Sequence, residues 1–271
     1  MTESLNYLLL GNLHVVSMSH WHGGLPPKTR MLLALLLTAG PKGVSTRRIV
    51  AGLWGDDFPL SAPQMIRTHV MRLRSMLGPH GAVHRTRGGY RIEAARSELD
   101  SAAFEDLLDA ARTAGAAGDP ARAAGLLRRA IGLWRGDTAL ADVREVLELE
   151  AEAVRLEELR LYAEELLADC LLVQGRTDEV LPGLLALCVR HPLRERLQAR
   201  LMLALAAAGR RAEAGQVYLR SRAALREQAG LEPSAQLSRV HRSLLGGDAW
   251  ESAMGFVSPL PASHPVDTSR Y

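Results

Sequence analysis

The stretch QMIRTHVMRLRSMLG, residues 64–78, combines an apolar stripe with three arginines. The stripe recurs at spacings of four, three and four residues, at Ile66, Val70, Leu73 and Leu77. This spacing is typical of an amphipathic helix whose apolar side packs on a core. The far side of such a helix carries Gln64, Arg67, Thr68, Met71, Arg72 and Ser75, with Arg74 beside the buried stripe. A cationic face of this kind is either an ordinary solvated surface or a contact with an acidic partner, and the rest of the chain must distinguish the two.

Charge is divided unevenly along the chain. Residues 1–92 contain eleven Lys and Arg against three Asp and Glu, whereas the 271-residue chain as a whole contains 33 against 30. Arginine richness by itself can follow from a GC-rich genome, so the placement of the arginines is the stronger signal. The asymmetry indicates a nucleic-acid-binding part followed by a part with another partner.

Three short elements are predicted before the cationic helix. Residues 5–16 are β-prone and broken by Gly11-Asn12, which favours a short antiparallel pair. Residues 27–39 predict a helix that begins at Pro27, ends before Gly40 and buries Met31, Leu32, Leu35 and Leu36. A second helix follows to Trp54, with Ser45 or Thr46 as its N-cap. The cationic helix itself starts with Ser61 and Gln64 at the spacing of a capping box.

A basic hairpin is predicted after the cationic helix. VHRTRGGYRI, residues 83–92, alternates toward a tight Gly88-Gly89 turn and carries Arg85, Thr86 and Arg87. Three helices followed by a basic hairpin, the wing, is the order of a winged helix-turn-helix, whose third helix lies in the major groove. The second helix also begins with Ser45, Thr46, Arg47 and Arg48, at an N-terminus whose N–H groups favour phosphate.

The second half of the chain is helical throughout. GRTDEVLPGLL at residue 175 and GRRAEAGQVYL at residue 209 start 34 residues apart, the tetratricopeptide period, and GDPARAAGLLRRA at residue 118 resembles a third copy. Residues 143–174 predict one long packed helix, because their apolar positions drift off a coiled-coil heptad. Such repeats form either a protein-binding groove or a purely structural or dimerising stack. Residues 246–271 lack periodicity and predict a flexible tail.

Signatures of catalysis and metal binding are absent from the sequence. It contains no phosphate-binding loop, no G-x-S-x-G and no H-E-x-x-H motif, and His20-Trp21-His22 lacks neighbouring cysteines or carboxylates. We therefore expect no enzyme activity, no cofactor and no metal. Cys170 and Cys188 both lie in apolar helical patterns, and the first residues have no basic segment before an apolar run. These features favour a reduced, cytoplasmic protein without a membrane anchor.

Several segments resemble one known family, the Streptomyces antibiotic regulatory proteins (SARPs). LWGDDFPLSA (53–62), THVMRLRSMLG (68–78) and TRGGYRI (86–92) are similar to the end of the second helix with its loop, the recognition helix and the wing of an OmpR-type DNA-binding domain. Residues 191–245 are similar to the bacterial transcriptional activation domain of these proteins. The resemblance implies a mainly α chain with three parts: a winged helix-turn-helix in 1–97, a tetratricopeptide-like activation domain in 98–245 and the tail.

The expected function is sequence-specific activation of transcription. By the resemblance, head-to-tail protomers bind direct repeats in double-stranded DNA, contact RNA polymerase and its sigma factor, and control an antibiotic or other secondary-metabolite gene cluster. We expect Arg67, Thr68 and Arg72 to read bases, since arginine pairs well with guanine, and the wing to contact DNA through Arg85, Thr86 and Arg87. Phosphate contacts are expected from Ser45, Thr46, Arg47, Arg48 and Arg74.

Some roles remain open at this level. His69 borders the buried stripe, so it is either a phosphate donor or a packing histidine. In OmpR-like folds the loop before the recognition helix contacts polymerase, which assigns Asp56, Asp57 and Phe58 to the sigma factor; alternatively an aspartate only caps the turn. A repeat-protein adaptor and a repressor of the same fold are the competing functions.

Overall fold

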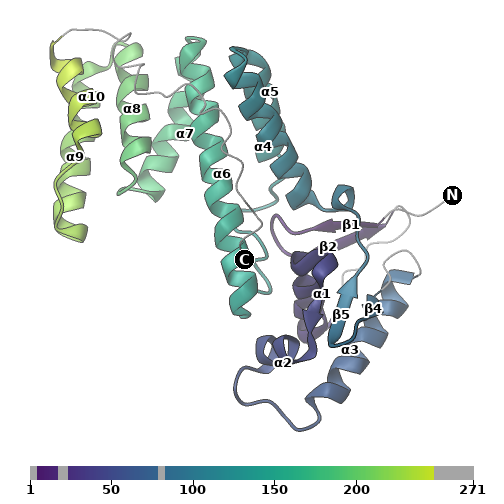
Figure 1. The fold of residues 1–271 in the computed structure, drawn as a ribbon. Helices are drawn as coiled ribbons and strands as arrows, with labels where there is room; N and C mark the ends of the chain where they lie inside the picture. Colours follow the sequence, from purple (N-terminus) through teal and green to yellow (C-terminus); the bar gives the residue numbers. More distant parts are fainter. Residues whose placement is uncertain (1–4, 18–23, 79–82, 247–271) are drawn as a thin grey trace. The chain divides into compact units, whose positions relative to one another are not determined.

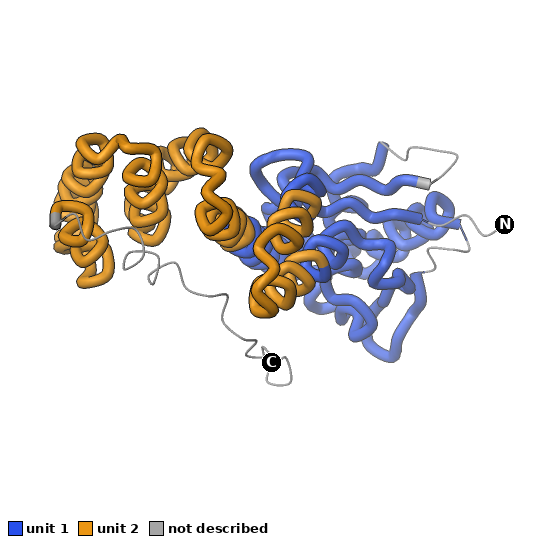
Figure 2. The backbone as a smooth tube through the Cα atoms, turned by 90° about the horizontal axis from the view of Figure 1, so that it is seen from above, with its two compact units in different colours: residues 1–106, 130–161 blue, residues 107–129, 162–271 orange. Residues whose placement is uncertain are grey.

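The computed structural model describes residues 5–17, 24–78 and 83–246. The chain forms two compact units that alternate along the sequence (Figure 2). Unit 1 consists of Met1–Asp106 and Ala130–Leu161, and unit 2 of Leu107–Arg129 and Tyr162–Tyr271. Unit 1 therefore includes residues on both sides of position 97, and the sequence-based boundary between 97 and 98 stays a prediction. The expected His20-Trp21-His22 loop and the tail lie outside the described residues, apart from Gly246, which ends a helix.

Unit 1 begins with a two-stranded antiparallel sheet, as the sequence predicts. Strand β1 (Leu5–Leu8) pairs with β2 (His14–Ser17), with Leu5 opposite Ser17. Two carboxylates from later in the chain hold the connection between the strands. Asp100 accepts hydrogen bonds from the N–H groups of Leu9 and Leu10 (2.6 and 3.1 Å), and Asp142 accepts one from Leu13 (2.8 Å). Both acids come after residue 97, so this sheet depends on the segments around them.

Helices α1 (Pro27–Ala39), α2 (Thr46–Trp54) and α3 (Ala62–Leu77) pack together and against the three-stranded sheet that contains the wing (Figure 1). Every side chain from Met31 to Leu37 is buried, so the buried face of α1 is wider than the four residues predicted for it. Ser45 is the N-cap of α2, because its side chain accepts the N–H of Arg48 at 3.3 Å. The prediction of a capping box at Ser61 is wrong. The Ser61 side chain makes no cap hydrogen bond and instead lies 3.7 Å from the Met65 sulfur.

The wing belongs to a three-stranded sheet in the order β3-β5-β4. Strands β4 (Val83–Arg85) and β5 (Gly89–Ile92) form the predicted hairpin, with Arg85 opposite Tyr90. The sequence gives no sign of β3 (Val44–Ser45), which pairs with β5 just before α2. Gly89 allows this pairing, because a Cβ there would lie 1.9 Å from the carbonyl oxygen of Val44. The wing is thereby fixed to the start of α2.

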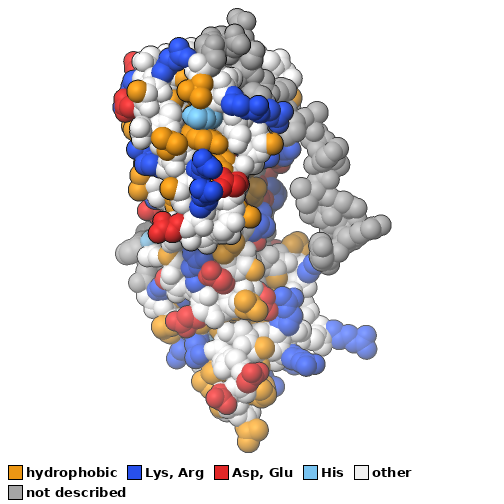
Figure 3. Space-filling model, turned by 90° about the vertical axis from the view of Figure 1, so that its left-hand side faces the viewer, with side chains coloured by type: hydrophobic (Ala, Val, Ile, Leu, Met, Phe, Trp, Pro, Cys, Tyr) orange, Lys and Arg blue, Asp and Glu red, His pale blue; other side chains and the backbone are white. Residues whose placement is uncertain are grey.

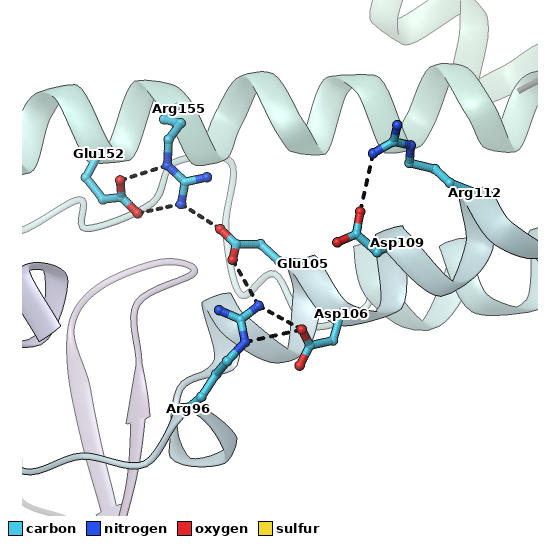
Figure 4. A network of polar contacts seen from close by, with 7 residues as sticks. All are labelled: Arg96, Glu105, Asp106, Asp109, Arg112, Glu152 and Arg155. Carbon is cyan, nitrogen blue, oxygen red and sulfur yellow. Dashed lines mark hydrogen bonds and ion pairs between the residues drawn. The ribbon is translucent and has the colours of Figure 1, made fainter. Parts of the chain in front are cut away.

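The residues of unit 1 that follow β5 are held together by aromatic and ionic contacts. Phe104 packs edge-on against Trp134, with the ring centres 5.7 Å apart. Figure 4 shows the ionic network: Arg155 contacts Glu105 at 2.6 Å and Glu152 at 2.7 Å, and Arg96 contacts Glu105 at 3.3 Å. This network joins the segment after β5 to α4 (Asp100–Ala116) and α6 (Leu147–Val173), two helices that contribute residues to both units.

Unit 2 is the predicted helical repeat. Its helices include α5 (Pro120–Ile131), α7 (Thr177–Arg190), α8 (Glu195–Ala207), α9 (Arg211–Ala229) and α10 (Ala235–Gly246), and the last four lie side by side (Figure 1). The long helix α6 is a single helix, as expected.

The same turn precedes α5, α7 and α9. Gly118, Gly175 and Gly209 have positive φ, and the N–H of the next residue donates to a carbonyl five residues earlier at 3.0, 2.9 and 2.8 Å respectively. This is the Schellman pattern, in which glycine supplies the left-handed residue that ends the preceding helix. The shared geometry supports the interpretation of residue 118 as the start of a third, less regular copy.

A charged cluster lies inside unit 2, between α6 and α8. Arg200 holds Asp169 with two hydrogen bonds of 2.7 Å and lies 3.3 Å from Glu165, which is only 2% exposed. Arg194 approaches Glu165 from the other side at 3.2 Å. Burial raises the pKa of Asp169, and the adjacent Arg200 opposes that shift. The cluster keeps its buried carboxylates paired with cations, as a protein interior requires.

No helix in the described part of the chain is long and apolar enough to cross a bilayer. Within the same residues no group of three or more His, Cys, Asp or Glu is placed to hold a metal ion. Cys170 and Cys188 are buried and unbonded to each other, which confirms their assignment to apolar helix faces.

Candidate nucleic-acid interface

The outward face of α3 matches the sequence prediction. Its apolar stripe is buried, and the polar face stands exposed at Gln64, Arg67, Thr68, Met71, Arg72 and Ser75. Arg67 donates to the Gln64 side-chain oxygen at 3.2 Å, and the Thr68 hydroxyl donates to the Gln64 carbonyl at 3.4 Å. Among the described residues, no acidic side chain pairs with Arg67 or Arg72. The face therefore presents cationic groups that an acidic partner can reach.

His69 does not belong to this face, so the phosphate-donor alternative is wrong for this residue. The ring is 8% exposed, and its Nδ1 lies 2.8 Å from the Thr29 hydroxyl on α1. Burial lowers the pKa of His69, and the nearby positive charges of Arg72 and Lys28 lower it further. A buried ring bonded to Thr29 is shielded from a phosphate at the surface, so His69 has the packing role that the sequence left open.

Arg74 connects α3 to the wing. Its side chain is exposed, and its Nε donates to the carbonyl of Val83, the first residue of β4, at 2.8 Å. This bond uses one of five guanidinium N–H groups, so the terminal nitrogens retain donors for phosphate. Arg74 thus positions the wing as well as adding charge beside it.

The wing exposes Arg85 and Arg87, with Thr86 half-buried between them. The N–H of Thr86 closes the turn on the Gly89 carbonyl at 3.0 Å. No ion pair with a described residue involves Arg85 or Arg87. The wing therefore adds a second cationic surface to unit 1.

The start of α2 differs in detail from the prediction. Ser45, Arg47 and Arg48 are exposed, but the N–H of Thr46 is used by the Gly88 carbonyl at 2.8 Å and that of Arg48 by Ser45. Fewer backbone donors are therefore free for phosphate than an isolated helix N-terminus would offer. Arg48 also lies 3.6 Å from Glu148, whereas Arg47 has no acidic partner among the described residues. The side chain of Arg47 is the most available cation at this end.

The loop between α2 and α3 combines acidic and apolar exposure. Asp56 and Asp57 are exposed, Phe58 is 53% exposed and Leu60 is 100% exposed. Figure 3 shows acidic and apolar side chains close together at the lower end of the molecule, where this loop lies. The turn closes through backbone bonds such as that from the N–H of Ala62 to the carbonyl of Pro59 at 2.8 Å, and neither aspartate accepts a hydrogen bond from a described residue. Turn capping therefore does not explain the two aspartates. The exposure of Leu60 was not predicted from the sequence, because a single leucine in a loop belongs to no helical or strand period.

Comparison with known proteins agrees with this geometry. Residues 99–245 match the family described as "Bacterial transcriptional activator domain", and residues 23–92 match "Transcriptional regulatory protein, C terminal". Regulatory protein DnrI of Streptomyces peucetius is 34% identical over 87% of this chain and 90% of its own length. The chain belongs to the Streptomyces antibiotic regulatory protein family.

Other SARP relatives differ in length. Regulatory protein AfsR of Streptomyces griseus is 37% identical over 91% of this chain, yet the chain spans only 25% of that relative. RedD of Streptomyces coelicolor is 32% identical over 86% of the chain and 68% of the relative. A solved structure of Mycobacterium tuberculosis EmbR, in complex with a low affinity phosphopeptide, superposes with a TM-score of 0.88 at 27% identity, covering 95% of this chain and 70% of EmbR. The mainly α architecture of this SARP is thus shared with EmbR.

Proposed function

We propose that this SARP binds promoter DNA sequence-specifically and activates transcription of an antibiotic or other secondary-metabolite gene cluster. The observation that carries the proposal is the cationic surface of unit 1, where Arg67 and Arg72 on α3 and Arg85 and Arg87 on the wing are exposed and lack acidic partners among the described residues. Unpaired arginines of this kind are attracted to the phosphate backbone and can bind guanine edges, so the surface favours DNA as its partner.

The residues divide into three roles. Arg67, Thr68 and Arg72 contact base edges in the major groove, where arginine binds guanine with two hydrogen bonds. Arg85, Thr86 and Arg87 enter or flank the minor groove, whose narrow A·T-rich stretches attract arginine. Phosphates are held by Ser45, Thr46, Arg47, Arg48 and Arg74.

Partner contacts complete the proposal. Two protomers bind head to tail on direct repeats, and RNA polymerase is recruited through its sigma factor. Asp56, Asp57 and Phe58 in the α2–α3 loop make this contact, supported by their exposure and by a turn that closes without the aspartates. Acidic side chains on a DNA-binding unit repel phosphate, so they suit a basic protein surface better.

The test is footprinting of the purified chain on the promoters that adjoin its gene, followed by transcription with purified polymerase. We expect protection of a direct repeat and an increase in transcript from the protected promoter. Protection without a transcript increase, or with a decrease, would contradict activation and favour a repressor. Absence of any protected sequence would contradict specific DNA binding altogether and favour the repeat-protein adaptor.

A further inference from the structure

The centre of the α3 face carries no charge. A helix advances about 100° per residue, so Gln64, Thr68, Met71 and Ser75 form the line directly opposite the buried stripe; we call these four residues the outer line. All four are exposed. Arg67 and Arg74 flank the outer line on one side and Arg72 on the other. When α3 faces a partner, the outer line makes the closest approach and the arginines reach past it.

Met71 is the only large apolar residue of the outer line and is 67% exposed. Another exposed methionine of the same helix, Met65, is 37% exposed, lies toward the Arg72 flank and has its sulfur near the Ser61 hydroxyl. Single exposed apolar side chains are common on protein surfaces, so the inference rests on where Met71 lies rather than on its exposure alone.

Thr68, one turn before Met71, strengthens the apolar character of this spot. Its hydroxyl bonds the Gln64 carbonyl at 3.4 Å, within the helix. The hydroxyl is thereby partly occupied, and the methyl group of Thr68 remains beside Met71, since residues three apart on a helix are neighbours. The middle of the outer line is thus an apolar spot inside a cationic face.

The major groove offers one apolar group to such a spot, the C5-methyl of thymine. A methionine side chain is unbranched and flexible, so it can follow a methyl group whose position varies with the docking angle of the helix. We propose that Met71 packs on a thymine C5-methyl in each half-site and is a specificity-determining residue of this SARP. The inference rests on the proposed function, because it needs α3 in the major groove.

The experiment removes one methyl group at a time. The full chain is titrated with the footprinted duplex, in which each thymidine in turn is replaced by deoxyuridine. Its base, uracil, has the same hydrogen-bonding edge as thymine but no C5-methyl. We expect one position per half-site at which affinity falls about fourfold, the effect of about 0.8 kcal/mol for one buried methyl or methylene group. With Met71→Ala, the thymine and deoxyuridine duplexes should bind equally at that position.

Two variants serve as controls. Met65→Ala makes the same truncation on the same helix and should keep the full deoxyuridine effect. Met71→Leu keeps an apolar side chain and should keep most of it. Because Met71 is exposed, none of the Met71 variants removes core contacts.

Two results would overturn the inference while leaving the proposed function intact. One is a flat deoxyuridine scan by a chain that still prefers its operator over scrambled DNA. The other is a deoxyuridine effect that persists unchanged in Met71→Ala. A chain with no preferred sequence would overturn the proposed function and this inference together.

Discussion

Arginines are used differently in the two units of this SARP. On α3 and the wing of unit 1, Arg67, Arg72, Arg85 and Arg87 are exposed and have no acidic partner among the described residues. In unit 2, by contrast, six arginines lie within 4 Å of carboxylates, namely Arg128, Arg176, Arg200, Arg210, Arg222 and Arg226. Arginines of the α3 face and wing are thus left without carboxylate partners, whereas Arg96 and Arg155 elsewhere in unit 1 and the six arginines of unit 2 are paired. The difference supports the proposed DNA contact of the α3 face and wing.

The comparison explains why composition alone is a poor guide here. A chain with 33 basic and 30 acidic residues has a net charge close to zero. In unit 2 many opposite charges are paired within 4 Å, whereas the arginines of the α3 face have no acidic neighbour to offset them. Exposed ion pairs contribute little stability individually. In unit 2 each pair places opposite charges within 4 Å, so the positive field of the paired arginine is largely cancelled.

The largest expected effect is on the stability of unit 2. Arg200→Met removes the cation shared by Glu165 and Asp169 and leaves two buried carboxylates without it. We expect a loss of about 3–5 kcal/mol in the free energy of unfolding, measured by urea denaturation. Arg222→Met, which breaks an exposed pair with Glu232, should cost less than about 1 kcal/mol. Equal losses for the two variants would show that burial of the Arg200 cluster has no energetic weight.

The next effect is on DNA specificity. Arg67→Ala and Arg72→Ala should each weaken operator binding by about 1–3 kcal/mol if each arginine binds a guanine through two hydrogen bonds. Binding to scrambled DNA should fall much less, because a base contact adds nothing there. Competition titrations with operator and scrambled duplexes measure both. Equal losses on the two duplexes would reassign these arginines to phosphate.

The next prediction concerns Asp56 and Asp57 in the α2–α3 loop, two acidic residues in the otherwise basic first part of the chain. Asp56→Asn combined with Asp57→Asn removes both charges and keeps side chains that can still accept hydrogen bonds. We expect a severalfold lower transcript yield at saturating operator occupancy, with DNA affinity unchanged or slightly higher because two repulsive charges are gone. Unimpaired transcription under these conditions would remove the loop from the polymerase contact.

The smallest effect compares two neighbouring arginines at the start of α2. Arg47→Ala should weaken binding to all sequences alike and reduce the slope of log affinity against log salt by about 0.9, the value for one phosphate contact. Arg48→Ala should do less, because Glu148 lies 3.6 Å from its guanidinium. If Arg48→Ala had the larger effect, the ion pair with Glu148 would not limit access to DNA.

Much of this structure follows from local patterns in the sequence. The 3.6-residue period sets the buried stripe and exposed face of α3, the Gly88-Gly89 turn sets the wing, and the glycines at 175 and 209 set the 34-residue repeat. Each of these features depends on residues close together in the chain, which is why sequence reasoning finds them.

Features that depend on distant residues could not be predicted. Strand β3 is two residues long, which is too short to show an alternating pattern in the sequence. It pairs with β5 because Gly89 has no Cβ to collide with the backbone of Val44. Asp100 and Asp142 hold the β1–β2 connection through backbone N–H groups, and such bonds leave no pattern in the partner's sequence. The burial of His69 likewise depends on Thr29, forty positions earlier. The exposure of the candidate residues on α3 and the wing could therefore be predicted from local pattern, whereas the burial of His69 could not, because a tertiary contact decides it.

The most direct test of the contrast between the units uses two variants with the same change in charge. One replaces Arg67, Arg72, Arg85 and Arg87 with alanine; the other replaces Arg176, Arg210, Arg222 and Arg226, all exposed and paired with glutamates in unit 2. The measurement is the affinity of each full chain for operator DNA across a series of salt concentrations. We predict that the first variant loses most of its preference for operator DNA at every salt concentration, because its base and groove contacts are gone, while the second binds like the native chain. Equal losses in the two variants would contradict the account, because overall charge rather than the α3 face and wing would then govern DNA binding.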